Sequence, residues 1–104
     1  MPKLTNAHDS LPSSIKNLLA YAIGKLKPKK IVLFGSRARG DAREDSDFDI
    51  AFSLSESGKQ AWAEFTTSLE EKNLTLYDLD LVDIEQLDEK YHENIKREGV
   101  VLYA

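Results

Sequence analysis

Apolar residues recur along the chain at two different spacings, and the spacing changes from one segment to the next. Residues 11–27 place apolar side chains three and four positions apart, which predicts an amphipathic helix that Pro28 ends. Residues 29–35 form a short β-branched and aromatic run, which is typical of a buried strand. In residues 46–54 apolar and polar side chains alternate, which predicts a strand with one buried face.

The second half of the chain shows the same two spacings. Residues 56–72 predict a second long helix, and residues 76–84 alternate as a third strand does. Helical spacing then continues over residues 84–99, where we expect a single helix. Residues 100–104 are apolar enough to predict a closing strand.

These elements follow the order α-β-β-α-β-α-β, which predicts an α/β (α+β) fold with helices flanking a mixed β-sheet. A chain of 104 residues has the size of one domain. We expect residues 1–10 to be an N-terminal lead-in and residues 11–104 to form that single domain. The pattern does not predict the order of the strands within the sheet.

Composition and charge narrow the classes of function. A net charge of −4 argues against nucleic-acid binding, which depends on clustered Lys and Arg. The chain has no cysteine, which excludes a disulfide framework and a Cys-based zinc site. The first ten residues lack the apolar core of a signal peptide, and no apolar run reaches membrane-spanning length. We therefore expect a cytoplasmic protein with no direct contact to membrane or nucleic acid.

Acidic residues occupy the polar side of two predicted strands. Asp47 and Asp49 project from the same face because they are two residues apart, and Asp80 lies opposite the apolar residues of its own strand. Two such charges about 4 Å apart repel by roughly 4 kcal/mol at an effective dielectric near 20. If the strands are neighbours, oxygen ligands without His or Cys favour Mg²⁺ or Mn²⁺, and paired ions suit nucleotidyl transfer. The competing interpretation is that these carboxylates are the solvent-exposed side of a sheet that helices cover on one face only.

A glycine–serine turn, GSRARG, directly follows the first predicted strand. Gly35 permits a tight turn and a close backbone approach to a ligand. Ser36 could cap a short helical turn whose N–H groups and hydroxyl face an anion, or simply cap an ordinary glycine turn. The segment is not a Walker A loop, because Asp41-Ala42 replaces the Lys-Ser/Thr pair. Only ten residues separate the turn from Asp47, so a phosphate cradle would lie beside the metal-binding pair.

The string GSRARGDAREDSDFDI, with Gly35-Ser36 and then Asp47-x-Asp49, resembles the signature of minimal nucleotidyltransferases. These MNT proteins are the smallest members of the polymerase-β-like nucleotidyltransferase superfamily. The later YDLDLVDI resembles the family strand that carries a third carboxylate, which we place at Asp80, with Asp78 and Asp83 as competing choices. The resemblance covers nearly the whole chain and implies the polymerase-β-like core.

The resemblance also implies a role for each motif residue. Asp47 and Asp49 would hold two Mg²⁺ ions, with Mn²⁺ as the alternative, and Asp80 would help bind one of them. Asp80 would also orient or deprotonate the attacking hydroxyl, and Gly35 with Ser36 would hold the triphosphate. The reaction would transfer a nucleoside monophosphate, usually AMP from ATP, and release pyrophosphate.

Three arginines lie in the same segment and have two competing interpretations. Arg37 and Arg39, which we assign to nucleotide binding, could steady the phosphates or the protein substrate together with Arg43. The arginines could equally pair with the acidic residues of their own loop, which are Asp41, Glu44 and Asp45.

The resemblance extends to a partner, because we expect no room here for the acceptor-binding domain of larger relatives. In the MNT family the acceptor is typically a small helical protein of the HEPN class, with which the MNT protein forms a toxin–antitoxin pair. The resemblance therefore implies an antitoxin, a protein adenylyltransferase that transfers AMP to a tyrosine of a HEPN ribonuclease. Two alternatives stay open. One is a non-catalytic nucleotide-binding antitoxin, and the other is the catalytic subunit of a small-molecule nucleotidyltransferase.

Overall fold

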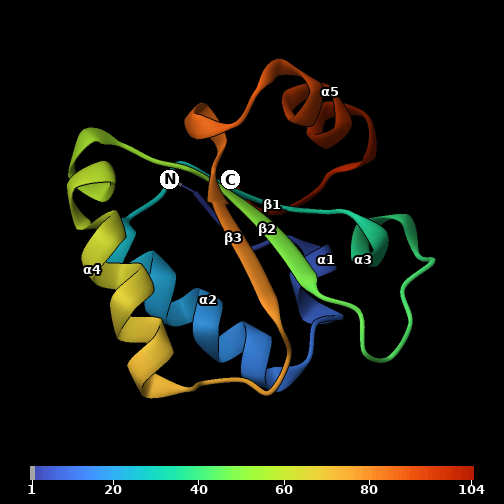
Figure 1. Ribbon diagram of the computed structural model, residues 1–104, viewed down its shortest axis with the longest axis horizontal. Helices are drawn as coiled ribbons and strands as arrows, with labels where there is room; N and C mark the ends of the chain where they lie inside the picture. Colours follow the sequence, from blue (N-terminus) through green and yellow to red (C-terminus); the bar gives the residue numbers. More distant parts are fainter. Residues whose placement is uncertain (1) are drawn as a thin grey trace.

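The computed structural model describes residues 2–104, in which four strands form one mixed sheet (Figure 1). The strands are β1 (Lys30–Phe34), β2 (Phe48–Ser53), β3 (Leu79–Asp83) and β4 (Val100–Tyr103). Their order is β3-β2-β1-β4, where β1 is antiparallel to β2 and β4, and β2 is parallel to β3. The mixed sheet flanked by helices that the sequence predicts is confirmed.

The helices connect and cover these strands. They are α1 (Asn6–Asp9), α2 (Ser13–Leu26), α3 (Ser36–Arg39), α4 (Glu56–Lys72) and α5 (Glu89–Glu98), with a short 3₁₀ turn, η1 (Ile84–Gln86). The predicted helix over residues 56–72 is confirmed with the same bounds, and Ser55 caps it by accepting a hydrogen bond from the N–H of Gly58. No helix within residues 2–104 has the length and apolar character needed to cross a membrane.

One face of the sheet packs against α2 and α4 to form the main core. Phe52 of β2 is fully buried there, and its ring contacts those of Trp62 and Phe65 edge-on, with centroids 5.6 and 6.2 Å away. Further members come from α2, α4 and the strands: Ile15, Leu18, Leu19, Ala22, Leu26, Leu69, Ile31, Leu33, Phe48 and Ile50. The apolar stripes that predict these helices therefore face the sheet, as the spacing requires.

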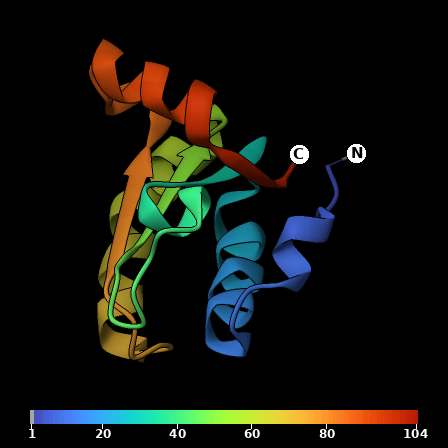
Figure 2. The same ribbon diagram turned by 90° about the vertical axis from the view of Figure 1, so that its right-hand side faces the viewer.

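The opposite face is covered only in part, by α5. Ile95 packs there against a small apolar cluster of Val32, Phe34 and Ala51. Ala51 lies on this face, as the alternation over residues 46–54 predicts, and it is fully buried in the same cluster. The second face of the strand is therefore buried in part, whereas the alternation alone predicts one buried face. Figure 2 shows α5 crossing the end of the sheet away from α2.

The single helix expected over residues 84–99 is two separate elements. Asp83 accepts a hydrogen bond from the N–H of Glu85 at 3.0 Å and caps η1. Asp88 accepts from the N–H of Tyr91 at 3.2 Å and caps α5, which begins at residue 89. Two aspartates that offer their side chains as caps thus interrupt a continuous helical spacing.

The third strand is shorter than the alternation over residues 76–84 predicts. The hydroxyl of Thr75 accepts a hydrogen bond from the N–H of Tyr77 at 3.2 Å, which forms a turn before the strand. The strand β3 therefore begins at Leu79, and Tyr77 lies in the segment that leads into it.

The N-terminal segment, which shows no periodic pattern, contacts the end of the chain. Leu4 forms a bridge with Tyr103, and the side chain of Thr5 donates to the carbonyl of Val101 at 2.6 Å. These bonds cover the outer edge of β4 and leave β3 as the open edge of the sheet. Met1, the first residue of the predicted lead-in, lies outside the described residues.

Candidate active site

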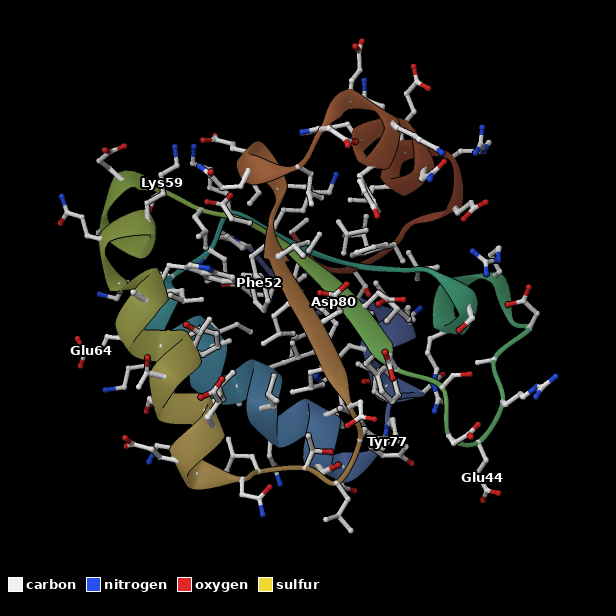
Figure 3. The ribbon with its side chains drawn as sticks, viewed as in Figure 1. Glu44, Phe52, Lys59, Glu64, Tyr77 and Asp80 are labelled. Atoms are coloured by element: carbon white, nitrogen blue, oxygen red, sulfur yellow. The ribbon has the colours of Figure 1, made fainter. Side chains whose placement is uncertain are left out.

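The register between β2 and β3 brings two of the predicted carboxylates together. Asp49 pairs with Asp80 on the adjacent parallel strand, and neighbouring strands lie about 4.8 Å apart. Both residues alternate with core residues, so their side chains project from the face opposite α2 and α4. Asp47 precedes the first residue of β2 and falls on the same face by this alternation. Figure 3 shows Asp80 on β3, beside β2.

The carboxylates act on each other electrostatically. The pKa of Asp49 is raised from its ordinary value, mainly because partial burial disfavours the charged form, and next because Asp80 and Asp47 are negative. The positive charge of Arg39 opposes this shift. A divalent cation would relieve the repulsion, and carboxylate oxygens are ligands that Mg²⁺ and Mn²⁺ accept.

The carboxylate oxygens of Asp47, Asp49 and Asp80 are suitable ligands for such an ion, but the three side chains do not point to one common position. Among residues 2–104, no three His, Cys, Asp or Glu side chains stand close enough together to hold a metal ion. Coordination would therefore require the aspartates to turn about their side-chain bonds toward a common position.

The structure separates the three choices for the third acid. Asp83 pairs with Phe52, is 7% exposed, and uses its carboxylate to cap η1. Asp78 lies before β3, where its main-chain carbonyl accepts a hydrogen bond from the N–H of Phe48 at 3.0 Å. Asp80 is exposed beside Asp49 and contributes to its raised pKa. These observations favour Asp80.

Gly35 lies directly against the Asp49 carboxylate. Its φ is +74°, a conformation that other residues rarely adopt. A Cβ at this position would clash with Oδ2 of Asp49 and lie 3.0 Å from its Cγ. The glycine therefore permits both the turn after β1 and the close approach of the turn to the aspartate.

The turn opens into the short helix α3. Gly35, and not Ser36 as the sequence suggests, occupies the cap position, and its carbonyl accepts hydrogen bonds from the N–H groups of Ala38 and Arg39, both at 3.1 Å. Within the described part of the chain, the N–H and hydroxyl of Ser36 and the N–H of Arg37 have no hydrogen-bond partner. Such unpaired donors at the start of a helix suit an anion, as a triphosphate would be.

The two arginines assigned to nucleotide binding lie in different surroundings. Arg39 is 44% exposed and donates to Asp41 and Glu98, both at 3.2 Å, which links α3 to α5. Arg37 donates instead to main-chain carbonyls of the loop that leads into β2. Contact of either arginine with a nucleotide stays a prediction.

Two residues near the site are absent from the sequence-based set. Glu98 is the partner of Arg39 from 59 residues further along the chain, and no local pattern could indicate such a pair. Tyr77 packs against Phe48 with ring centroids 5.0 Å apart. The available signal is an aromatic residue beside an aspartate in each acidic segment: Phe48 stands between Asp47 and Asp49, and Tyr77 directly precedes Asp78.

This chain resembles known proteins in sequence and in fold. Residues 16–104 match the family described as Polymerase beta, Nucleotidyltransferase. A protein of Methanocaldococcus jannaschii named as a protein adenylyltransferase is 34% identical over 79 residues, which cover 74% of this chain and 78% of the relative.

Solved structures give the same result for the fold. A structure described as a minimal nucleotidyltransferase is 27% identical, with a TM-score of 0.64 over 89% of this chain and 93% of that one. One chain of a toxin–antitoxin structure with AMP-PNP is 29% identical, with a TM-score of 0.57 over 85% of this chain and 68% of that one. The predicted polymerase-β-like core is confirmed. The chain belongs to the polymerase beta nucleotidyltransferase family and is a nucleotidyltransferase of the minimal type.

Proposed function

We propose that this nucleotidyltransferase transfers AMP from ATP to a tyrosine of a partner HEPN ribonuclease and acts as the antitoxin of that pair. The observation that carries the proposal is the contact of Gly35 with Asp49, next to the register pair of Asp49 and Asp80. A turn with free N–H donors, which suits phosphates, thereby lies beside carboxylates, which suit the cations that accompany phosphates.

Each group has a defined part in the transfer. Two Mg²⁺ ions, or Mn²⁺, would be held by Asp47, Asp49 and Asp80, and when bound they supply positive charge to the triphosphate. The turn at Gly35 and Ser36 holds the triphosphate through N–H groups. Asp80 accepts the proton of the attacking hydroxyl. The oxygen of the acceptor bonds to the α-phosphorus, the bond from that phosphorus to the bridging oxygen breaks, and pyrophosphate leaves.

The relatives support both the donor and the kind of acceptor. The toxin–antitoxin structure contains AMP-PNP, an analogue of ATP, and the Methanocaldococcus protein is named for adenylyl transfer to protein. A second toxin–antitoxin structure is 29% identical, with a TM-score of 0.60. These likenesses support a protein partner for this chain, and the resemblance of its motifs to the MNT signature supports the HEPN class.

The position of Asp80 suits an acceptor that arrives on a separate protein. β3 is the open edge strand, so Asp80 is exposed at the border of the sheet. A groove of about 520 Å³ also runs along this open edge, between β3 and the helix α4, whose Thr66 and Glu70 line it. Leu76, which also lines it, is 98% exposed. A partner could therefore approach the third carboxylate without displacing any element of the fold.

The test is the mass of the partner after expression with and without this protein. We expect the partner to gain adenylyl groups on a tyrosine when the wild-type chain is present, and none with Asp49→Asn. Asp9→Asn, at an acid that is 79% exposed on α1, is the matched control and should act as the wild type does. An unmodified but inhibited partner would overturn the proposal in favour of a binding-only antitoxin. Transfer of AMP to a small molecule in place of the partner would favour the catalytic subunit of a small-molecule nucleotidyltransferase.

A further inference from the structure

Three side chains near the candidate site form one stack. The guanidinium carbon of Arg37 lies 4.4 Å from the centre of the Phe48 ring and 5.4 Å from that of Tyr77. The two rings meet edge to face, with an interplanar angle of 82°. The three residues come from α3, β2 and the segment that leads into β3, and Figure 3 shows Tyr77 at the beginning of that strand.

The same guanidinium holds the loop between α3 and β2. Its Nη2 donates to the carbonyl of Ser46 at 2.9 Å and to that of Glu44 at 3.1 Å, and its Nε donates to Ser46 at 3.3 Å. Arg43 and Ser46 close the loop with two bonds of their own, at 2.8 and 3.0 Å. The arginine thus fixes the last residue before Asp47.

Each member of the stack is close in sequence to a residue of the proposed site. Arg37 directly follows Ser36, and Phe48 separates Asp47 from Asp49. Tyr77 stands three residues before Asp80. Contacts among the three side chains therefore hold together the three segments that carry the phosphate turn, the aspartate pair and the third carboxylate.

We propose that Arg37 is a positioning residue that, together with Phe48 and Tyr77, sets the spacing between the phosphate turn and the three carboxylates. The proposal rests on the nucleotidyl transfer proposed above. It assigns the Arg37 guanidinium to the protein's own loop carbonyls, whereas direct phosphate contact would need the same planar donors turned toward the nucleotide.

Arginine has the chemistry that this position requires. Its planar group stacks on aromatic rings while its N–H donors, which lie in the same plane, reach two carbonyls at once. Lysine keeps the charge, but its single ammonium has no planar face to stack on a ring while it donates to both carbonyls. Loop positioning and direct phosphate contact therefore predict different results for Arg37→Lys.

The experiment compares Arg37→Lys, Arg37→Ala and Tyr77→Leu with the wild type. Arg97→Ala is the control, since among residues 2–104 the Arg97 side chain bonds only to Asn94 within α5. Amide hydrogen exchange is measured over residues 43–49 without substrate, and β1 serves as the internal reference for folding. Steady-state transfer gives kcat and the KM for ATP.

We expect all three variants to exchange faster over residues 43–49 while β1 stays protected. A displacement of about 1 Å can cost about 100-fold in rate, so kcat should fall by up to about 100-fold while the KM for ATP changes far less. Arg37→Lys should resemble Arg37→Ala, and Tyr77→Leu should share the defect. The control should match the wild type in both measurements.

The opposite pattern would overturn the proposal. A raised KM for ATP in Arg37→Ala that Arg37→Lys restores, with unchanged exchange and a silent Tyr77→Leu, would assign Arg37 to the phosphates. Loss of β1 protection in every variant would mean that the stack supports the whole fold and not the site. The hydrogen-exchange measurement needs no acceptor. A wild type without transfer activity would therefore contradict the proposed function, while the exchange rates over residues 43–49 would still test the role of Arg37.

Discussion

The two faces of the sheet use the same strand for different purposes. Toward α2 and α4, β2 presents Phe48, Ile50 and Phe52, none of which is more than 2% exposed. On the other face it presents Ala51, which α5 buries, and Asp49, which α5 leaves partly open. The first face is continuous apolar core, whereas the second is apolar at one end and acidic at the other.

This difference separates stability from activity at adjacent positions of one strand. A side chain on the core face contributes its burial to the free energy of unfolding. A carboxylate on the other face opposes folding through burial and repulsion, as the raised pKa of Asp49 indicates. Substitutions one residue apart should therefore damage different properties of the protein.

The largest effect is expected on the core face. Phe52→Ala removes a fully buried ring and should lower the free energy of unfolding by about 3–5 kcal/mol. Domains of this size have a total free energy of unfolding of about 5–15 kcal/mol, so the variant should lose a large part of its stability. Denaturant titration followed by the fluorescence of Trp62, which contacts this ring, measures the change. A loss below about 1 kcal/mol would show that this face does not dominate stability.

The next largest effect is the loss of transfer when the acidic face of the sheet, which carries Asp47, Asp49 and Asp80, is changed. Asp49→Asn should lower the rate by about 100-fold or more, because a metal ligand contributes several kcal/mol to the transition state. The same variant should unfold at a denaturant concentration no lower than the wild type does. A variant that transfers AMP at the wild-type rate would remove Asp49 from the site.

Gly35→Ala tests the contact between the phosphate turn and the acidic face. The added Cβ meets the Asp49 carboxylate at a backbone φ of +74°, so we expect transfer to fall by tens of fold and stability by about 1–2 kcal/mol. Gly40→Ala is the matched control, because its φ is +84° while, within residues 2–104, no atom beyond its chain neighbours lies within 4 Å of the added Cβ. Equal losses of activity in both variants would assign the effect to the backbone alone.

The choice of the third acid gives a smaller contrast. Asp80→Asn should reduce transfer at least about tenfold more than Asp78→Asn does, because Asp80 faces Asp49 across the strand pair. Initial rates of both variants, measured with the same partner, decide this. A larger defect in Asp78→Asn would move the third carboxylate to that residue.

The smallest effect is the pH dependence of stability. The native state raises the pKa of Asp49 above the ordinary value of about 3.9, so it favours the protonated form. As the pH rises through the raised pKa, ionised Asp49 should cost the wild type stability that Asp49→Asn keeps. Denaturant midpoints of both proteins between about pH 4 and 7 measure this difference. A gap that narrows with rising pH would contradict the repulsion.

Local patterns were sufficient to predict most of the fold. The spacing over residues 56–72 predicted α4 with its observed bounds, because its apolar stripe and its capping Ser55 agree. The alternation over residues 46–54 predicted β2 and its core face. The patterns failed where side chains cap locally, as Asp83 and Asp88 do, since capping depends on geometry that spacing does not contain.

The site was predictable in its residue types and not in its contacts. The motif predicted the nearness of Gly35-Ser36 to the aspartate pair, because only ten residues lie between them. The pairing of Asp49 with Asp80 depends on strand order, and strand order is set by long-range packing. The stack of Arg37 on two rings joins three distant segments, so no local pattern contains it.

The most direct test of the central claim uses ATP labelled at either the α- or the γ-phosphate, with Mg²⁺ and the purified partner. The acidic face should transfer the α-label to the partner and never the γ-label, and both Asp49→Asn and removal of Mg²⁺ with a chelator should abolish labelling. Label from the γ-phosphate, or equal α-labelling by Asp49→Asn, would contradict a metal-dependent adenylyl transfer at this face.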